Sequence, residues 1–198
     1  MFTGVILSDD WRLVFRAEAG KSVSVYNTWI NPATETGHDD ACQTLQPQTQ
    51  CSGPYKNAIV DDWNNLNITQ VKIELHSGRR RVAYLVFDGT GSDYTNWFSK
   101  DRILESSWSD LSQNAVYNYF SLVGHGARTL LISKSYAGCP ADMVWFCVMD
   151  SQQYNCDWDH HSSYPAFLYS PENTASLFET NRGLAEILAI FVKTQTTP

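Results

Sequence analysis

The segment QVKIELH (residues 70–76), the turn SG (77–78) and the segment RVAYLVF (81–87) together decide the fold of this chain. In the first segment an apolar residue occupies every second position, which is the period of a half-buried β-strand. The second segment is an apolar run that ends at the turn pair Asp88-Gly89. Two strand-like segments joined by a short turn predict a β-hairpin.

Similar patterns on both sides of this hairpin predict further strands. Residues 184–193 are long enough for a helix, but their β-branched and aromatic content favours a strand. One short helix is predicted at residues 100–105, with Ser99 as its N-cap, and residues 27–65 are interpreted as a long polar loop. The predicted strands outside the hairpin are residues 11–17, 117–123, 128–133, 143–150, 166–170 and 184–193.

Many short strands and at most one or two short helices predict an all-β fold, either an antiparallel sandwich or a barrel. The chain has 198 residues, of which 43% are hydrophobic, so it is long enough to bury a core. No repeat or linker divides it, and residues 1–198 are predicted to form one domain. The net charge of −7 disfavours nucleic acid as a partner. No run approaches the roughly 18 consecutive apolar residues of a membrane helix, so membrane insertion is not predicted.

Four of the five cysteines lie in loop-like surroundings. Cys42 and Cys51 bracket one polar run, Cys139 precedes a proline, and Cys156 precedes an aspartate. We therefore predict two local disulfides, Cys42–Cys51 and Cys139–Cys156. Cys147 lies inside an apolar run and is predicted to be a buried free thiol. The alternative is a cytosolic protein with five reduced thiols.

The triplet Asn67-Ile68-Thr69 is a glycosylation sequon that leads into a strand. The sequon and the predicted disulfides favour an oxidising compartment, so we expect a secreted protein with Asn67 as a glycosylation site. Residues 1–8 lack the basic region and the full-length apolar region of a signal peptide. We favour a secreted chain whose signal has been removed over one that stays inside the cell.

The loop DGTGSD (88–93) is the first candidate site. Its two carboxylates are five positions apart with two glycines between them, and such a loop can direct oxygens at a hard cation. Asp88 and Asp93 are therefore candidate calcium ligands, and calcium is the one candidate cofactor. The alternative is an ordinary turn in which the glycines supply positive φ angles.

The segment CDWDHH (156–161) holds the densest group of carboxylates and imidazoles in the chain. In an extended loop Asp157, Asp159 and His161 would share a face and could contact a cation or a sugar. The alternative is a solvated loop tethered by a disulfide, with Trp158 packed on the core.

Aromatic residues make up 13% of the chain, and many stand beside Asp or Asn. The apolar face of a pyranose stacks on an aromatic ring while its hydroxyls bind carboxylates and amides. This pairing favours sugar recognition, with Trp97 or Trp158 as the stacking residue. The alternative is that the aromatic residues fill a β core, as most of them must.

Motifs of known enzymes are scarce. The chain has no Gly-x-Ser-x-Gly, no His-Glu-x-x-His and no phosphate-binding glycine loop. His125 lies between two glycines in a predicted turn and could act as an acid or a base. The alternative is a solvated turn.

Several motifs from about residue 71 onward combine Tyr, Trp, Cys and Asp in one pattern. They are FDGTGSD (87–93), WFS (97–99), SWSDL (107–111), YNYFS (117–121), YAGC (136–139) and CDW (156–158), with Asp142, Trp145 and Asp150. In these motifs the chain resembles an uncharacterised cysteine- and tryptophan-rich module of secreted proteins from molluscs and other marine invertebrates. The resemblance implies secretion and one domain, and it implies no catalytic residues.

These observations together predict a secreted, non-enzymatic carbohydrate-binding protein, lectin-like and with calcium as a candidate cofactor. Its expected partners are glycans or glycoproteins, and a homo-oligomer is compatible with the sequence. Two other functions stay open. One is a structural or adhesive component of extracellular matrix, mucus or egg, with self-association through aromatic patches. The other is an unrecognised secreted enzyme that uses His125 or the 157–161 cluster.

Overall fold

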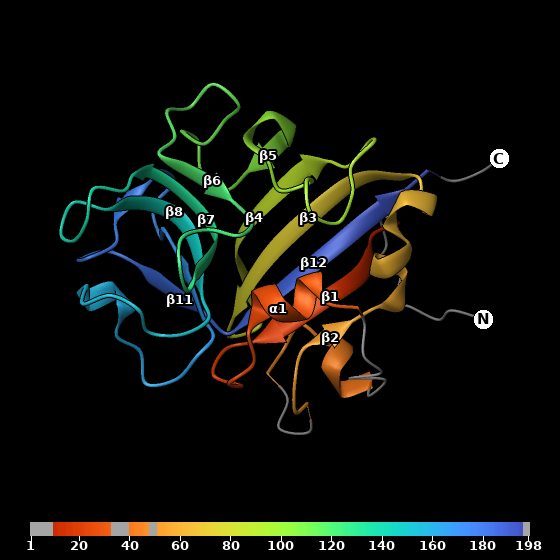
Figure 1. The fold of residues 1–198 in the computed structure, drawn as a ribbon, viewed down its shortest axis with the longest axis horizontal. Helices are drawn as coiled ribbons and strands as arrows, with labels where there is room; N and C mark the ends of the chain where they lie inside the picture. The colour runs from red at the N-terminus through yellow and green to blue at the C-terminus, as the bar shows by residue number, and fades with distance from the viewer. Residues whose placement is uncertain (1–9, 33–39, 48–50, 196–198) are drawn as a thin grey trace.

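The computed structural model describes residues 10–32, 40–47 and 51–195, and its strands form two antiparallel sheets (Figure 1). Sheet A runs β2 (Tyr55–Lys56), β1 (Arg12–Glu18), β12 (Ile187–Thr194), β3 (Ile68–Ser77), β4 (Arg80–Asp88) and β5 (Ile103–Ser106). Sheet B runs β11 (Gly183–Ala185), β9 (Ala166–Tyr169), β8 (Met143–Met149), β7 (Arg128–Ser135) and β6 (Tyr119–Ser121), with β10 (Ser176–Leu177) paired to β8. The predicted all-β class is confirmed, and an antiparallel sandwich fits the arrangement.

The helical segments are short, and several lie in the stretch expected to be a loop. They are α1 (Val25–Ile30) and four 3-10 segments, η1 (Asp40–Gln43), η2 (Ala58–Asn65), η3 (Lys100–Arg102) and η4 (Asp157–Asp159). The predicted helix at 100–105 is wrong in its second half, where the chain forms β5. Tertiary pairing decides this, because Glu105 and Ile103 pair with β4. No helix in the described part of the chain is long and apolar enough to cross a membrane.

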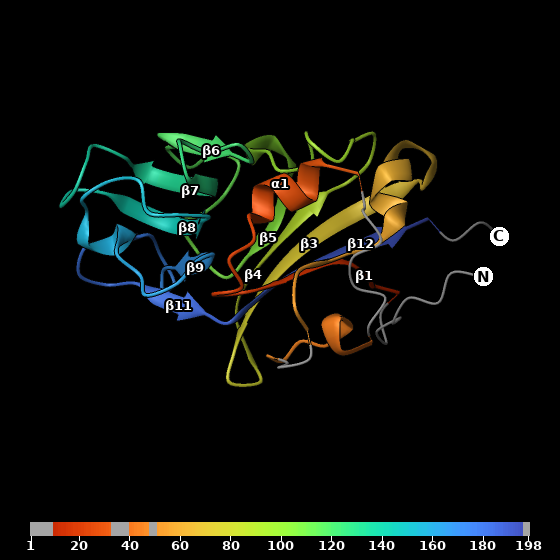
Figure 2. The same ribbon diagram turned by 60° about the horizontal axis from the view of Figure 1, so that its bottom comes forward.

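A carboxylate from sheet B holds the start of α1. Ser24 is the N-cap, and its side chain accepts a hydrogen bond from the N–H of Asn27. Asp150, just after β8, accepts hydrogen bonds from the N–H groups of Val25 at 2.7 Å and Tyr26 at 3.2 Å and from the Ser24 hydroxyl at 2.6 Å. These contacts fix α1 across one face of sheet A (Figure 2).

The main core lies against that same face of sheet A and is rich in aromatic rings. Trp97 is at its centre, with ring centroids 5.7 Å from Trp29, 6.4 Å from Trp63 and 5.4 Å from Phe87. The Trp97 side chain is 0% exposed. The predicted stacking role of Trp97 is therefore wrong, because the ring is buried among core side chains and is closed to a ligand.

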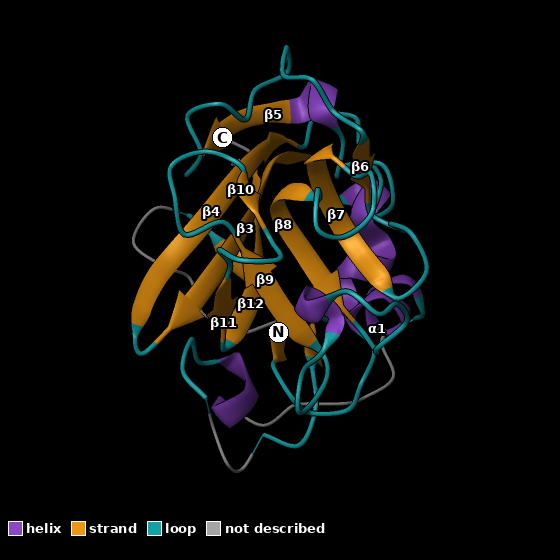
Figure 3. Cartoon of the chain, turned by 90° about the vertical axis from the view of Figure 1, so that its left-hand side faces the viewer, coloured by secondary structure: helices purple, strands orange, loops and turns teal. Residues whose placement is uncertain are grey.

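The segment 184–193 is a strand as expected, but it is shared between the two sheets. Glu186 separates β11 of sheet B from β12, which lies between β1 and β3 in sheet A. The Glu186 N–H donates to His76 O at 2.8 Å, and the Ala19 N–H donates to Glu186 O at 2.9 Å. The join between the sheets is thereby fixed by backbone hydrogen bonds. Figure 3 views the molecule from the side of sheet B, with β11 and β12 close together.

Both predicted disulfides are confirmed. Cys42 is bonded to Cys51 and Cys139 to Cys156. Cys147 is a buried free thiol, also as predicted, and burial raises its pKa far above the ordinary value. Two disulfides in a chain of this size are typical of extracellular proteins.

The outer face of sheet A carries a compact charged group centred on Glu74. The Glu74 carboxylate lies 2.9 Å from Lys72 Nζ, 2.9 Å from His76 Nε2 and 3.0 Å from Arg81 Nη1. Burial alone would raise the pKa of Glu74, but the hydrogen bonds from His76, Lys72 and Arg81 outweigh it and lower the pKa to about 2.

Replacing Glu74 by glutamine is expected to make the free energy of unfolding fall less steeply as the pH is lowered. Because the native pKa of about 2 lies below the ordinary 4.5, ionised Glu74 stabilises the fold above about pH 4.5. That contribution is lost as the pH falls from 4.5 towards 2. We expect the free energy of unfolding, measured by urea titration, to fall less steeply for Glu74→Gln, by at most about 1.4 kcal/mol per pH unit. Equal slopes would contradict the proposed role of this carboxylate.

Candidate functional site

The segment predicted to bind ligand, 156–161, folds onto the outer face of sheet B. The Cys139–Cys156 disulfide tethers it, and Trp158 packs into a second core cluster together with Cys147 and Phe178. Trp158 is 0% exposed, with the Arg128 guanidinium 3.6 Å from its ring centroid. Its predicted stacking role is wrong, because protein groups cover the ring.

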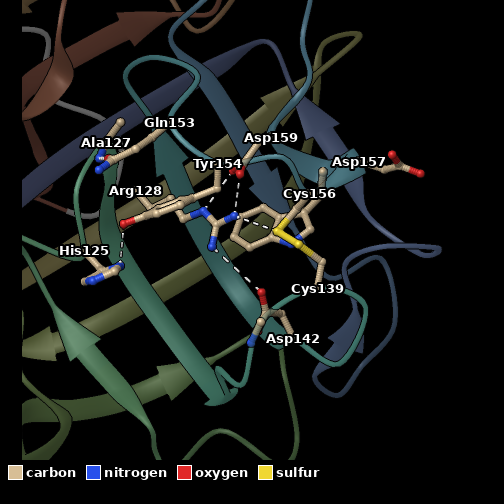
Figure 4. Close-up of polar contacts among 12 residues, drawn as sticks. His125, Ala127, Arg128, Cys139, Asp142, Gln153, Tyr154, Cys156, Asp157 and Asp159 are labelled. Carbon is tan, nitrogen blue, oxygen red and sulfur yellow. Dashed lines mark hydrogen bonds and ion pairs between the residues drawn. A yellow bond between two sulfur atoms is a disulfide. The ribbon is translucent and has the colours of Figure 1, made fainter.

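The polar residues of this segment do not share a face. Asp159 is 0% exposed, whereas Asp157 is exposed and points away from it (Figure 4). His161 turns back on its own loop, with Nε2 3.0 Å from Trp158 O, and burial lowers its pKa. The 3-10 turn η4 sends neighbouring side chains in different directions, which an extended loop would not do. The grouping of Asp157, Asp159 and His161 at one site is therefore wrong.

Asp88 and Asp93 each accept hydrogen bonds within their own loop. Asp88 Oδ1 accepts from the N–H of Thr90 at 2.9 Å, and Asp93 Oδ1 accepts from the N–H of Thr95 at 2.7 Å. Asp93 also accepts from the Asn96 side chain at 2.8 Å. These are the contacts of ordinary turns. Within residues 10–32, 40–47 and 51–195 no group of three or more His, Cys, Asp or Glu side chains is placed to hold a metal ion.

The centre of the sheet B outer face is Arg128, which is 2% exposed. Its Nε and Nη2 donate to the two carboxylate oxygens of Asp159, at 2.9 and 2.6 Å. Its Nη1 donates to the Tyr136 hydroxyl and lies 3.8 Å from Asp142 Oδ2. Burial alone would lower the pKa of Arg128, but Asp159 and Tyr136 outweigh it and raise the pKa, so the guanidinium stays charged. Arg128 is thus a fixed cation beneath the surface.

Above this cation three tyrosines and a histidine meet at the surface. We call Tyr119, His125, Tyr136 and Tyr154 the tyrosine–histidine cluster. The His125 ring lies parallel to Tyr154 with centroids 5.6 Å apart, and 5.8 and 5.7 Å from Tyr119 and Tyr136. His125 Nδ1 is 3.0 Å from the Tyr154 hydroxyl and 3.4 Å from the Tyr136 hydroxyl. His125 is exposed and the tyrosines are half-buried, so the cluster faces solvent.

A rigid turn places His125 in this cluster. His125 and Arg128 exchange backbone hydrogen bonds of 2.9 and 3.2 Å. Gly124 has a φ of +72°, and a Cβ there would lie 1.8 Å from Arg128 O. Only glycine fits this position. The turn predicted from the glycines is confirmed, and its backbone hydrogen bonds place His125 beside the tyrosines.

The cluster combines aromatic rings with neutral polar groups. Burial raises the pKa of Tyr136 to about 12, so its phenol remains a neutral hydroxyl. The surface therefore presents aromatic faces, phenolic hydroxyls and an imidazole, with the buried Arg128 side chain 4.6 Å from the Tyr154 ring centroid. His125 is a candidate residue from the sequence, whereas Arg128 and Tyr154 carry no local motif that indicates a site.

No family model matches the chain, and neither a curated protein nor a solved structure does.

Proposed function

We propose that this chain is a secreted carbohydrate-binding protein whose sugar site is the tyrosine–histidine cluster. The observation that carries the proposal is the meeting of three tyrosine rings and His125 at the surface over the fixed cation Arg128. Aromatic rings suit the apolar face of a sugar, and phenolic and imidazole groups suit its hydroxyls. The two disulfides support an extracellular location.

The rigidity of the cluster supports this function further. Tyr136 is held by Arg128, and His125 is held by its glycine turn. A preorganised surface loses little conformational entropy when a ligand binds. The cluster thus replaces Trp97 and Trp158 as the stacking surface, while the class of ligand stays as the sequence predicts.

Replacing Tyr154 by alanine is expected to weaken glycan binding about tenfold, since one aromatic stacking contact contributes roughly 1 kcal/mol and a hydroxyl contact is lost with it. The measurement is a glycan array on the oxidised protein, followed by titration of the best ligand. Tyr84→Ala is the matched control, because Tyr84 is a half-buried tyrosine on sheet A. Tyr154→Phe keeps the ring and separates stacking from hydrogen bonding.

The array is run with calcium and again with a chelator, which tests the predicted calcium assistance at Asp88 and Asp93. Binding lost on chelation would support a calcium-assisted lectin. Binding unaffected by chelation would remove calcium and leave the cluster as the site. Binding that survives both Tyr154→Ala and His125→Ala would contradict the cluster, and an array without any binding would contradict the lectin function.

An adhesive extracellular role is the second candidate, and exposed apolar side chains favour it. Val116 and Val123, on either side of the edge strand β6, are 76% and 58% exposed. Leu104 on β5, an edge strand of sheet A, is 49% exposed. Concentration-dependent self-association that no monosaccharide reverses would favour this role. An enzymatic function of His125 remains a prediction from the sequence.

A further inference from the structure

The sequon residue Asn67 lies at a hollow of about 300 Å³ at one end of sheet A. Its amide and hydroxyl walls come from residues before and at the start of β3, in the loop after β4 and after β12, and none of the lining side chains is charged. Trp63 and Ile68 add apolar surface. The polar lining residues are Asn64, Asn67, Thr69, Thr90, Ser92 and Gln195.

The walls of the hollow are held in place by hydrogen bonds. Asn67 O accepts from the Gln195 N–H at 3.0 Å. Thr69 Oγ1 donates to Lys193 O at 3.1 Å, and the Trp63 indole donates to Ser92 Oγ at 3.2 Å. Gly89 closes the wall so tightly that a Cβ there would lie 2.7 Å from Ile68 Cγ2. The hollow is therefore a formed feature of the fold.

The chemistry of the hollow suits a small neutral ligand. Its volume is at the lower end of the roughly 300–1,000 Å³ of small-molecule sites, and uncharged amides and hydroxyls suit a polyhydroxylated ring rather than an anion or a metal ion. Asn67 is exposed, and its φ of +47° is a left-handed conformation that asparagine tolerates. The sequon asparagine thus lines a hollow whose uncharged polar walls suit a sugar.

We propose that Asn67 carries an N-linked glycan whose first sugar, an N-acetylated hexosamine, lies in this hollow. In the attachment step Asn67 Nδ2 forms a bond to the anomeric carbon of a diphospholipid-linked oligosaccharide, and the anomeric C–O bond breaks. The lipid diphosphate leaves with the electron pair, and the amide releases one proton to solvent. The proposal rests on the secretory route of the proposed function and is independent of the tyrosine–histidine cluster.

The first test asks whether Asn67 is modified. The chain is made in a secretory eukaryotic host, and its intact mass is measured before and after amidase release of N-glycans. We expect a mass loss for the wild type and for Thr69→Ser, which keeps the sequon, and none for Asn67→Asp. A wild-type mass that the amidase does not change would overturn the proposal.

The second test asks where the first sugar lies. The glycan is trimmed to one sugar with an endoglycosidase, and the control is the same chain made without glycan in an oxidising bacterial periplasm. The trimmed chain should melt about 2–4 °C higher than the control, because a sugar packed in the hollow stabilises the folded state. Gln195→Ala should reduce this difference, and a nuclear Overhauser effect should join the acetamido methyl to the Trp63 indole. Equal melting temperatures without such a contact would place the sugar in solvent and overturn the proposal.

These outcomes are separable from those of the lectin proposal. Asn67→Asp leaves the tyrosine–histidine cluster intact, so its glycan-array signal should equal that of the wild type. A chain that fails the glycosylation tests but still binds glycans on the array would overturn the proposal for Asn67 and its hollow. The lectin proposal would stand.

Discussion

Arg128→Met is expected to lower the free energy of unfolding by about 3–5 kcal/mol, the usual effect of removing one partner of a buried ion pair. Asp159 is 0% exposed and Asp142 is 1% exposed, and both would keep a buried carboxylate without its cation. Asp142 Oδ2 already lacks a hydrogen-bond partner among the described residues. Urea titration at neutral pH measures the loss.

Lys134→Met is the matched control for Arg128→Met. Lys134 forms an ion pair with Asp110 at 3.4 Å, but 44% of its side chain is exposed. An exposed pair contributes roughly 0–1 kcal/mol, so the control should unfold almost as the wild type does. Adding Asp159→Asn to Arg128→Met should recover part of the lost stability, since it removes one stranded charge. A loss for Arg128→Met no larger than that of the control would contradict the buried network.

Trp97→Ala is expected to destabilise the fold by about 3–5 kcal/mol, because it leaves a cavity in the aromatic core. Trp97 is 0% exposed, and its indole N–H donates to Tyr94 O at 3.1 Å. Trp97→Phe should lose less, since it keeps most of the ring volume. Leu104→Ala removes an exposed apolar side chain as the control and should cost little. Thermal unfolding measures the loss. A Trp97→Ala variant as stable as the Leu104→Ala control would contradict the place of Trp97 at the centre of the core.

The fold class could be predicted because its signals are local. The alternation in residues 70–76 appears in the structure as β3, whose Val71, Ile73 and Leu75 face the core while Glu74 faces outward. The disulfide pairing was also predictable, because each bridge closes a short loop. Strand ends were less predictable, since Glu186 divides one apolar segment between two sheets.

The site could not be predicted in the same way, because its contacts join distant positions. Arg128 and Asp159 are 31 positions apart, and Asp150 binds the start of α1 from 125 positions away. Nothing in the residues around Trp97 or Trp158 tells whether these rings face the core or the solvent. Composition indicates that most tryptophans are buried, but only tertiary structure shows that Trp97 and Trp158 are among them.

The place of β12 in sheet A has a consequence for biosynthesis. Its partners β1 and β3 comprise residues 12–18 and 68–77, yet β12 itself is made of residues 187–194. Until residues 187–194 have been synthesised, β1 and β3 lack the strand that lies between them, so each has one unpaired edge. Sheet A is completed only after this late segment leaves the exit tunnel. A nonsense codon shortly before this segment would therefore yield a chain with two open strand edges. Such a chain is expected to aggregate and not to behave as a slightly shortened protein.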